Sequence, residues 1–279
     1  MVTGAASGIG RALAVRFAGL GMRVVVADVD EAGLAETVTM IEGAGAEALA
    51  VPTDVAEAAA VQQLADRTLD RFGAVHVVCN NAGVFASGTC WEAPLEDYAW
   101  LLDVNVWGVV HGIRTFVPLL LAQADGGHVV NTASMAAVTS TPYAGVYTMT
   151  KHAVLALSES LYHELTFAGG RVGVSVLCPE AVATGIADAE RNRPARRRPV
   201  DAARSPEAAL TDQAIRDAIA AGVDPALMAE RVERAIRERR FYVLAEDEWR
   251  RACETRLEDI RLGRNPTFSV PGAARAEET

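Results

Sequence analysis

The sequence predicts an α/β fold in which helices cover both faces of a doubly wound parallel sheet. Short valine-rich runs alternate with longer helical patterns from the start of the chain to Cys178, and such alternation favours right-handed crossovers between parallel strands. The runs are apolar throughout rather than alternating with polar residues, which is typical of strands buried on both faces. The length of 279 residues suits one large α/β domain or two small ones.

The strands and helices are expected in alternation along the chain. After a very short first strand at Met1–Thr3, we predict strands at Arg23–Ala27, Ala46–Pro52, Val75–Asn80, Gly127–Thr132 and Gly173–Cys178. Helices are predicted at Ile9–Gly19, Glu31–Gly43, Ala56–Phe72, Pro94–Leu121 and Tyr147–Thr166. Glycine, aspartate or asparagine bounds each strand, and these residues favour turns.

The pattern changes after Pro179. Residues 185–206 contain six arginines and three prolines without clear periodicity, and we expect a surface loop there. Helices follow at Thr211–Ala221 and Asp224–Arg239, the second beginning with an N-cap aspartate and a proline. A last strand is expected at Phe241–Ala245.

A closing helix is expected over Glu246–Leu262, with Gly263 at its end. Its inward face would consist of Trp249, Cys253, Leu257 and Ile260. From Arg264 to Thr279 we expect a frayed tail.

Composition and charge exclude several classes of function. The net charge of −10 and the pI of about 5.1 argue against nucleic-acid or anionic-membrane partners, which need a basic surface. The four cysteines form no Cys-x-x-Cys pair and have no histidine cluster beside them, so we expect neither a metal site nor a disulfide framework. The N-terminus lacks the pattern of a signal peptide, and Asn105, His111 and Arg114 interrupt the longest apolar stretch. These features favour a cytoplasmic protein.

A glycine-rich turn directly precedes the first predicted helix. It reads Thr-Gly-Ala-Ala-Ser-Gly-Ile-Gly over residues 3–10. Gly4 would allow a tight turn, Gly8 a close approach to a pyrophosphate, and Gly10 the packing of helix on strand. The free N–H groups of the helix would then face the phosphates. The candidate cofactor-binding residues here are Gly4, Ser7, Gly8, Ile9 and Gly10; the alternative is an ordinary glycine-rich turn.

Asp28 follows the second predicted strand. A carboxylate in that place hydrogen-bonds the adenosine ribose hydroxyls and repels a 2′-phosphate. No Arg or Lys stands at positions 29 or 30 or directly before Gly8. We therefore expect NAD rather than NADP, the alternative being that Asp28 only forms a turn.

Several further motifs together resemble the short-chain dehydrogenase/reductase family. They include Thr-Gly-x-x-x-Gly-x-Gly at the start, Asn-Asn-Ala-Gly at residues 80–83, and Tyr-x-x-x-Lys formed by Tyr147 and Lys151. Ser134 follows the fifth strand, and Asn105 lies in a Val-Asn-x-x-Gly segment. The resemblance covers residues 1 to about 185. Its further candidate cofactor contacts are Asp54, Val55, Asn81, Ala82, Gly83, Pro179, Val182 and Thr184.

The resemblance implies a single Rossmann domain with a seven-stranded parallel sheet in the order 3-2-1-4-5-6-7. We expect that domain at residues 1–263, with a variable substrate lid at about 185–240 and an added helix at 246–262. It further implies a nicotinamide cofactor across the carboxyl ends of the strands. A homo-oligomer, a dimer or a tetramer, would form through the helices at 94–121 and 147–166, and the added helix favours the dimer.

The four candidate catalytic residues fit the interconversion of an alcohol and a ketone. Tyr147 would be the general acid–base, and the ammonium of Lys151, on the same helix face, would lower its pKa from about 10. Ser134 would hydrogen-bond the substrate oxygen. By resemblance, Asn105 would kink its helix and hold a water that connects Lys151 to solvent. Taken singly, each residue has an ordinary reading as a surface pair, a helix cap or a solvated side chain, and His111, His152 and His163 are interpreted as structural.

Three departures from the family pattern stand out. The first strand is nearly missing, Glu180 stands where the family prefers glycine, and the segment after Thr184 is long and arginine-rich. We expect Glu180 to face solvent, the alternative being an effect on substrate charge. The arginines at 191–198 are expected to be solvated, the alternative being contact with a substrate carboxylate or phosphate.

The expected substrate is a hydrophobic secondary alcohol or ketone. The candidate pocket residues are mainly apolar: Val84, Phe85, Met135, Ala136, Ala137, Pro142, Tyr143 and Ala144. An alternative is an NAD-binding sensor or scaffold without turnover, but such proteins typically lose the Tyr or the Lys. A dinucleotide-dependent epimerase or dehydratase usually needs a longer C-terminal substrate domain.

Overall fold

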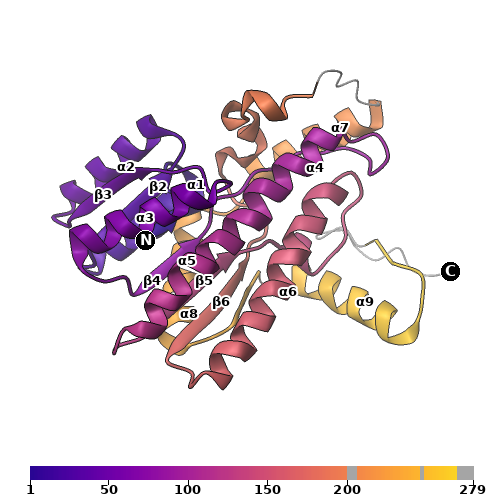
Figure 1. The fold of residues 1–279 in the computed structure, drawn as a ribbon. Helices are drawn as coiled ribbons and strands as arrows, with labels where there is room; N and C mark the ends of the chain where they lie inside the picture. Colours follow the sequence, from indigo (N-terminus) through magenta and orange to yellow (C-terminus); the bar gives the residue numbers. More distant parts are fainter. Residues whose placement is uncertain (200–205, 246–247, 269–279) are drawn as a thin grey trace.

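The valine-rich runs form one parallel sheet in the computed structural model, which describes residues 1–199, 206–245 and 248–268 (Figure 1). Its seven strands stand in the order β3-β2-β1-β4-β5-β6-β7, as the resemblance implies. They are β1 Val2–Thr3, β2 Val24–Asp28, β3 Ala48–Pro52, β4 Val77–Asn80, β5 Gly127–Thr132, β6 Val172–Cys178 and β7 Tyr242–Leu244. Although β1 has only two residues, it pairs with both β2 and β4 and so occupies the middle of the sheet.

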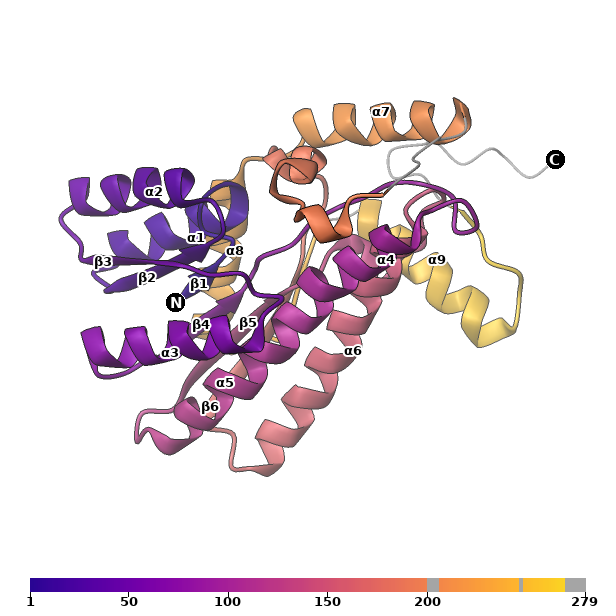
Figure 2. The ribbon, with the colours of Figure 1, turned by 45° about the horizontal axis from the view of Figure 1, so that its top comes forward.

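Helices cover both faces of this sheet. They are α1 Gly8–Gly19, α2 Glu31–Gly43, α3 Ala58–Phe72, α4 Leu95–Leu101, α5 Gly108–Ala122, α6 Gly145–Phe167, α7 Pro206–Ala220, α8 Pro225–Glu238 and α9 Glu248–Leu262. Figure 2 shows α1, α2 and α8 on one side and α3, α5 and α6 on the other. The predicted elements are confirmed with ends shifted by a few residues; the expected start of the closing helix at 246–247 lies outside the described residues.

Each strand contributes to a core on both sides. In β2, Val24 and Val26 pack with Leu13 and Met228 on one face, whereas Val25 and Ala27 join the opposite cluster. Because successive side chains of a strand point to opposite faces, a strand with helices on both sides has to be apolar at every position. This explains why these runs lack alternation.

The long apolar helix expected at 94–121 is interrupted. Leu102–Trp107 form a π-helical turn between α4 and α5, and Asn105 lies within it. Such turns contain an extra residue and are frequent at functional sites. By length and composition alone, the stretch Leu95–Ala122 would suffice to cross a membrane. In this fold it packs on the sheet and buries Trp100, Phe116 and Leu120.

The expected inward face of the closing helix is only half right. Trp249 packs on an apolar cluster at the end of β6, but Leu257 and Ile260 are 55% and 62% exposed. Figure 1 shows the reason, since α9 extends away from the body after its first turns. Of the predicted tail, residues 264–268 lie outside any helix or strand, and 269–279 lie outside the described residues.

Candidate functional site

A cavity of about 550 Å³ lies at the carboxyl ends of the strands. In open α/β sheets ligands bind at this edge, where the strand order reverses. The structure brings nearly all candidate residues together here. Those that line the cavity are Gly4, Ser7, Gly8, Ile9, Gly10, Asp28, Asp54, Val55, Asn81, Ala82, Gly83, Ser134, Tyr147, Lys151, Pro179, Val182 and Thr184. Asn105 is buried behind this lining.

The glycine turn is closed so tightly that side chains would not fit. A Cβ on Gly10 would lie 2.0 Å from the carbonyl oxygen of Gly4, and one on Gly4 would lie 2.8 Å from Cα of Ala82. Gly4 and Gly8 also have positive φ angles of 67° and 52°, which other residues rarely adopt. The N-cap residue of α1, Ser7, makes no side-chain capping bond. The first N–H groups of α1 therefore remain available to an anion.

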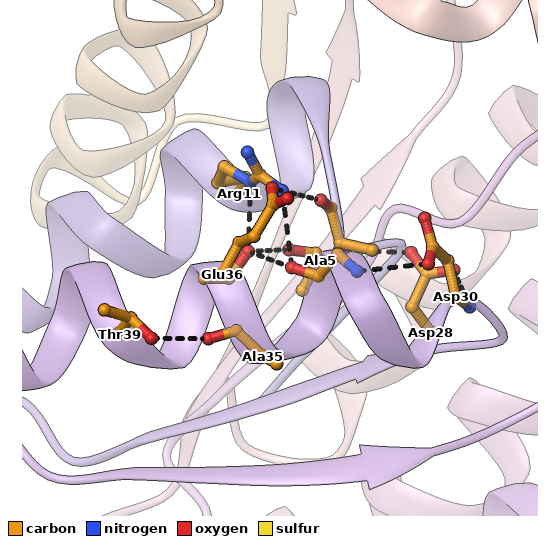
Figure 3. A network of polar contacts seen from close by, with 10 residues as sticks. Ala5, Arg11, Asp28, Asp30, Ala35, Glu36 and Thr39 are labelled. Atoms are coloured by element: carbon orange, nitrogen blue, oxygen red, sulfur yellow. Dashed lines mark hydrogen bonds and ion pairs between the residues drawn. The ribbon is translucent and has the colours of Figure 1, made fainter.

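Asp28 is held in place by this turn (Figure 3). Its Oδ2 accepts a hydrogen bond from the backbone N of Ala6 at 3.0 Å, and its Oδ1 accepts one from Asp30 N at 3.1 Å. On the far side of the turn, Arg11 donates to Ala6 O and pairs with Glu36 at 2.8 Å. The carboxylate is thus fixed at the end of β2, on the cavity wall.

The turn after β4 is bound to β1 and β5. The side chain of Asn81 donates to Thr3 O at 3.0 Å and accepts from Thr132 Oγ1 at 3.2 Å. Thr3 Oγ1 accepts from the backbone N of Asn81 and of Ala82. These bonds hold the ends of three neighbouring strands in register, and the polar atoms of Asn81 are engaged within the protein.

Ser134, Tyr147 and Lys151 line the cavity near the end of β5, and β1 and β4 lie between this strand and β2, which ends at Asp28. Ser134 follows β5, while Tyr147 and Lys151 come from the first turns of α6. Lys151 Nζ donates to Thr132 O at 3.0 Å and lies 5.5 Å from the centre of the Tyr147 ring. The ammonium is therefore fixed by β5 beneath the phenol.

The pKa of Tyr147 differs from the expectation. Desolvation in the cavity wall raises the pKa of Tyr147 to about 12, although a hydrogen bond with Ser134 acts in the opposite direction. Burial also lowers the pKa of Lys151 to about 8. The expected lowering of the tyrosine pKa by its lysine neighbour is not seen in the protein alone, because desolvation of the phenol is the largest influence on it.

Asn105 organises the loop above β4. Its Nδ2 donates to Val84 O at 3.0 Å and to Thr150 Oγ1 at 3.1 Å, and its Oδ1 accepts from Val84 N at 2.8 Å. A Cβ built on Gly83 would lie 3.4 Å from both Asn105 Oδ1 and Lys151 Nζ. The amide of Asn105, in the π-helical turn, and the ammonium of Lys151 therefore both lie close to Gly83, and the water that the resemblance implies between them stays a prediction.

The apolar end of the cavity differs in part from the expected pocket. Val84, Phe85, Ala136 and Ala144 line it. Met135 and Ala137 instead point into the core, and Pro142 and Tyr143 are not part of the lining. The apolar lining residues that sequence reasoning missed come from α4, from the lid and from α9: Trp100, Ile186, Ala189, Ile215, Ala218, Ile219 and Trp249. The helical spacing of Ile215, Ala218 and Ile219 was a usable signal, since it marks one face of α7.

Glu180 is not solvated as expected. Its carboxylate pairs with Arg231 of α8 through contacts of 2.8 and 2.9 Å, and both side chains are 12% exposed. The pair ties the end of β6 to α8 at the cavity wall.

The arginine segment, residues 185–199, is also not a solvated loop. It forms two short 3₁₀ helices, Gly185–Asn192 and Ala195–Arg197. Arg193 is buried against Asp97, Arg197 pairs with Asp103 at 2.8 Å, and Arg196 pairs with Glu57 at 3.0 Å. Arg204 lies outside the described residues. These three arginines thus have acidic partners, although Arg196 stays half exposed. Arg191 lines the cavity and bonds to the backbone carbonyls of Gly185 and Asp188, so contact with an anionic substrate group stays open for it.

The histidines lie away from the chemistry. Nδ1 of His111 is 2.9 Å from Val55 O, and Nδ1 of His152 is 3.0 Å from Thr148 O. Within the described part of the chain, no group of three or more His, Cys, Asp or Glu is arranged to hold a metal ion.

Comparisons with known proteins agree with this geometry. The family model described as short chain dehydrogenase matches residues 1–195. A 1-deoxy-11-beta-hydroxypentalenate dehydrogenase of Streptomyces avermitilis is 46% identical over 186 residues, which are 66% of this chain and 68% of the relative. A CLA biosynthesis dehydrogenase/reductase of Lactiplantibacillus plantarum is 31% identical over 261 residues, 93% of this chain and 91% of the relative. The crystal structure of a short chain dehydrogenase/reductase from Burkholderia phymatum in complex with NAD is 48% identical, covers 96% of each chain and has a TM-score of 0.94.

Proposed function

The chain belongs to the short-chain dehydrogenase/reductase family, and from that premise we propose that it is an NAD-dependent oxidoreductase that interconverts a secondary alcohol and a ketone. The observation that supports this most is that Tyr147, Lys151 and Ser134 line the same cavity as the glycine turn and Asp28. A dinucleotide laid along that cavity would have its reactive ring beside a proton donor.

Three features of the candidate cofactor site support NAD as the cofactor. The uncapped N-terminus of α1 and the closely packed glycines suit a pyrophosphate. Asp28, anchored by two backbone N–H groups, suits the adenosine ribose hydroxyls and disfavours a 2′-phosphate. Asp54 and Val55 would contact the adenine, and Pro179, Val182 and Thr184 the nicotinamide end.

The proposed chemistry is a proton transfer at the substrate oxygen. When bound, the nicotinamide accepts or donates a hydride at the substrate carbon. Tyr147 Oη takes the alcohol proton or returns it to the ketone oxygen, and Ser134 holds that oxygen by a hydrogen bond. Lys151 positions the nicotinamide ribose, and Asn105 connects Lys151 to solvent through a water.

Tyr147 needs help to act as a base near neutral pH, because desolvation raises its pKa to about 12. The positive charge of the oxidised cofactor is one source, since a nearby opposite charge stabilises the phenolate. In the reverse direction a raised pKa is an advantage, because the protonated phenol is the form that reduction requires.

The proposed substrate is a mainly apolar secondary alcohol or ketone. The outer walls of the cavity consist of Trp100, Ile215, Ile219 and Trp249 with smaller residues between them. Of the charged side chains in this region, Glu180 pairs with Arg231 and Arg197 with Asp103, whereas Arg191 lines the cavity and donates to the backbone carbonyls of Gly185 and Asp188. A similar dehydrogenase is named for a hydroxypentalenate, which carries both a hydroxyl and a carboxylate, so its name supports an alcohol substrate and not the absence of charge.

We further propose a single domain over residues 1–263, with its lid at about 185–240. Cytoplasmic location, a homo-oligomeric state, and the absence of nucleic-acid and membrane partners complete the proposal. Its acidic net charge supports the last point.

Tyr147→Phe tests the catalytic role. The variant keeps the ring but loses the proton, so we expect kcat on secondary alcohols to fall about a hundredfold or more. NADH binding, measured by fluorescence titration, should change little. Tyr143→Phe is the matched control, because Tyr143 precedes the same helix but does not line the cavity. Tight NAD binding by the unaltered protein, with no turnover of any alcohol in a broad panel, would favour the sensor or scaffold instead.

A further inference from the structure

A buried ion pair joins the arginine segment to α4. The Arg193 and Asp97 side chains are 1% and 5% exposed, and the guanidinium contacts the carboxylate through Nη2 and Oδ1. Arg193 also binds Glu190 at 2.7 Å, and its Nε donates to Arg197 O at 2.6 Å. The one guanidinium therefore bonds to both 3₁₀ helices of the segment and to the wall opposite.

The same guanidinium covers a tryptophan of the cavity wall. Its central carbon lies 4.6 Å from the centre of the Trp100 ring. Asp97 and Trp100 are three residues apart on α4, so one helix face presents both to Arg193. Trp100 is 1% exposed, lines the cavity, and packs in one apolar cluster with Val84 and Ala189, which Tyr147 borders.

The other ion pairs of the segment are of a different kind. Arg196 and Glu57 are 52% and 60% exposed, and Arg197 and Asp103 are 32% and 25% exposed. Exposed pairs contribute little, whereas breaking a buried pair leaves an uncompensated charge in the protein. The position of the segment therefore depends chiefly on Arg193.

We propose that Arg193 and Asp97 form a latch that holds the arginine segment closed over the substrate end of the cavity and fixes Trp100 as its wall. Both are positioning residues, which act on the substrate through Trp100 and the segment. The role in substrate positioning rests on the proposed function, whereas the closing of the segment does not. Breaking the pair would let the segment open and the wall move, while the glycine turn and Asp28 stay as they are.

Limited trypsin digestion measures the opening without any substrate. The segment offers cleavable bonds after Arg191, Arg196 and Arg197, whereas Arg193 and Arg198 precede prolines and resist trypsin. Asp97→Asn breaks the ion pair and removes no cleavage site. Since proteolysis of a locally open state follows the population of that state, we expect cleavage at these three bonds to rise about tenfold or more.

Three comparisons separate a latch from a general loss of stability. Mass spectrometry of the fragments should show that bonds elsewhere in the chain are cut at the original rate. Glu57→Gln is the matched control, because it frees Arg196 of the same segment from an exposed pair, and cleavage should change less than about twofold. Asp97→Glu keeps the carboxylate and should restore most of the protection.

Kinetics test the effect on the substrate. For an alcohol that the protein oxidises, Asp97→Asn should raise KM about tenfold while kcat and the dissociation constant of NADH change less than about threefold. Unchanged cleavage at the three bonds would overturn the latch, as would a uniform rise across the chain. Faster cleavage with an unchanged KM would overturn the positioning role. If no alcohol is oxidised, the proposed function fails, and the digestion still decides on the latch.

Discussion

At the scale of single residues, the site combines two ionisable groups whose neutral forms the protein favours. Burial raises the pKa of Tyr147 to about 12 and lowers that of Lys151 to about 8. In return, the Lys151 ammonium donates a hydrogen bond to Thr132 O. Such opposed shifts in a cleft are typical of functional sites, because the bound ligand completes the missing interactions.

Lys151 predicts a pH dependence of stability. Its folded pKa of about 8 lies below the unfolded value of 10.5, so the unfolded state binds more protons between these values. The free energy of unfolding should therefore rise with pH through this window, and the gain is lost as pH falls through about 8.

The comparison with Lys151→Met isolates this contribution. Between about pH 7 and pH 10, urea unfolding of the unaltered protein should gain about 2–3 kcal/mol relative to the variant. Parallel curves for the two proteins would mean that the lysine titrates normally. The range ends near pH 10 because the phenol of residue 147 begins to lose its proton there in the unfolded state, whereas the folded state retains this proton and the titration of Tyr147 then also changes the stability.

Asp28 predicts the choice of cofactor. Asp28→Ser removes the charge that would repel a 2′-phosphate, so the ratio of kcat/KM for NAD to that for NADP should fall about tenfold or more. Asp30→Ser is the control, because Asp30 is the nearby N-cap of α2 and does not line the cavity. An unchanged ratio in Asp28→Ser would show that the ribose is recognised elsewhere.

At the scale of elements, the approach of α5 to β4 depends on Gly112. A Cβ there would lie 2.0 Å from Oδ1 of Asn80. Asn80 is buried and donates to Asn131 Oδ1 at 2.9 Å, and Asn131 donates to Ser158 at 3.0 Å. This polar chain links β4, β5 and α6, so α5 must come close without displacing it.

Gly112→Ala therefore tests whether packing outweighs helix propensity. Alanine normally stabilises a helix interior by about 1 kcal/mol, but overpacking at this position should lower the free energy of unfolding by about 1–3 kcal/mol. Gly43→Ala in α2 is the matched control, because nothing lies within 4 Å of its Cβ position. Thermal or urea unfolding of both variants measures the difference, and a stabilised Gly112→Ala would contradict the packing argument.

The elements that sequence predicts well are those with local signals. Strands such as Gly127–Thr132 and helices such as Glu31–Gly43 were predicted to the residue, because turn residues mark their ends. The π-helical turn at Asn105 was not visible from periodicity, and only the family resemblance pointed to a kink. The spacing of hydrophobic residues cannot distinguish a π-helical turn, which contains one extra residue, from a regular α-helical turn.

Contacts between distant segments were the least predictable. Arg193, Arg196 and Arg197 were interpreted as part of a polar loop because their acidic partners, Asp97, Glu57 and Asp103, stand far away in sequence. The prediction of the inward face of α9 was partly wrong for a related reason. The apolar residues Leu257 and Ile260 share one helix face, but this spacing does not reveal whether the helix packs on the rest of the domain.

At the scale of the whole molecule, exposed apolar side chains mark the long helices. Trp107 lies before α5 and Met149 lies on α6, and they are 52% and 41% exposed. Figures 1 and 2 show α5 and α6 side by side on one face of the molecule. Exposed apolar surface of this kind favours association.

Sedimentation tests the proposed oligomer. We expect a mass of at least twice that of the chain, and Trp107→Glu combined with Met149→Glu should shift it toward the monomer. The control is Leu257→Glu with Ile260→Glu on α9, which should leave the mass unchanged. Dissociation by the control alone would assign the contact to α9 instead.

The cavity also has a consequence for how such enzymes diversify. The cradle for the dinucleotide comes almost entirely from the chain up to Thr184, whereas much of the outer wall, including Ile186, Ile215 and Trp249, comes later. A protein that arises by recombination with one breakpoint near residue 184 would therefore take its dinucleotide preference from one parent. It would take much of its substrate preference from the other. Selection can then remodel what the protein accepts without disturbing the machinery that reacts with it.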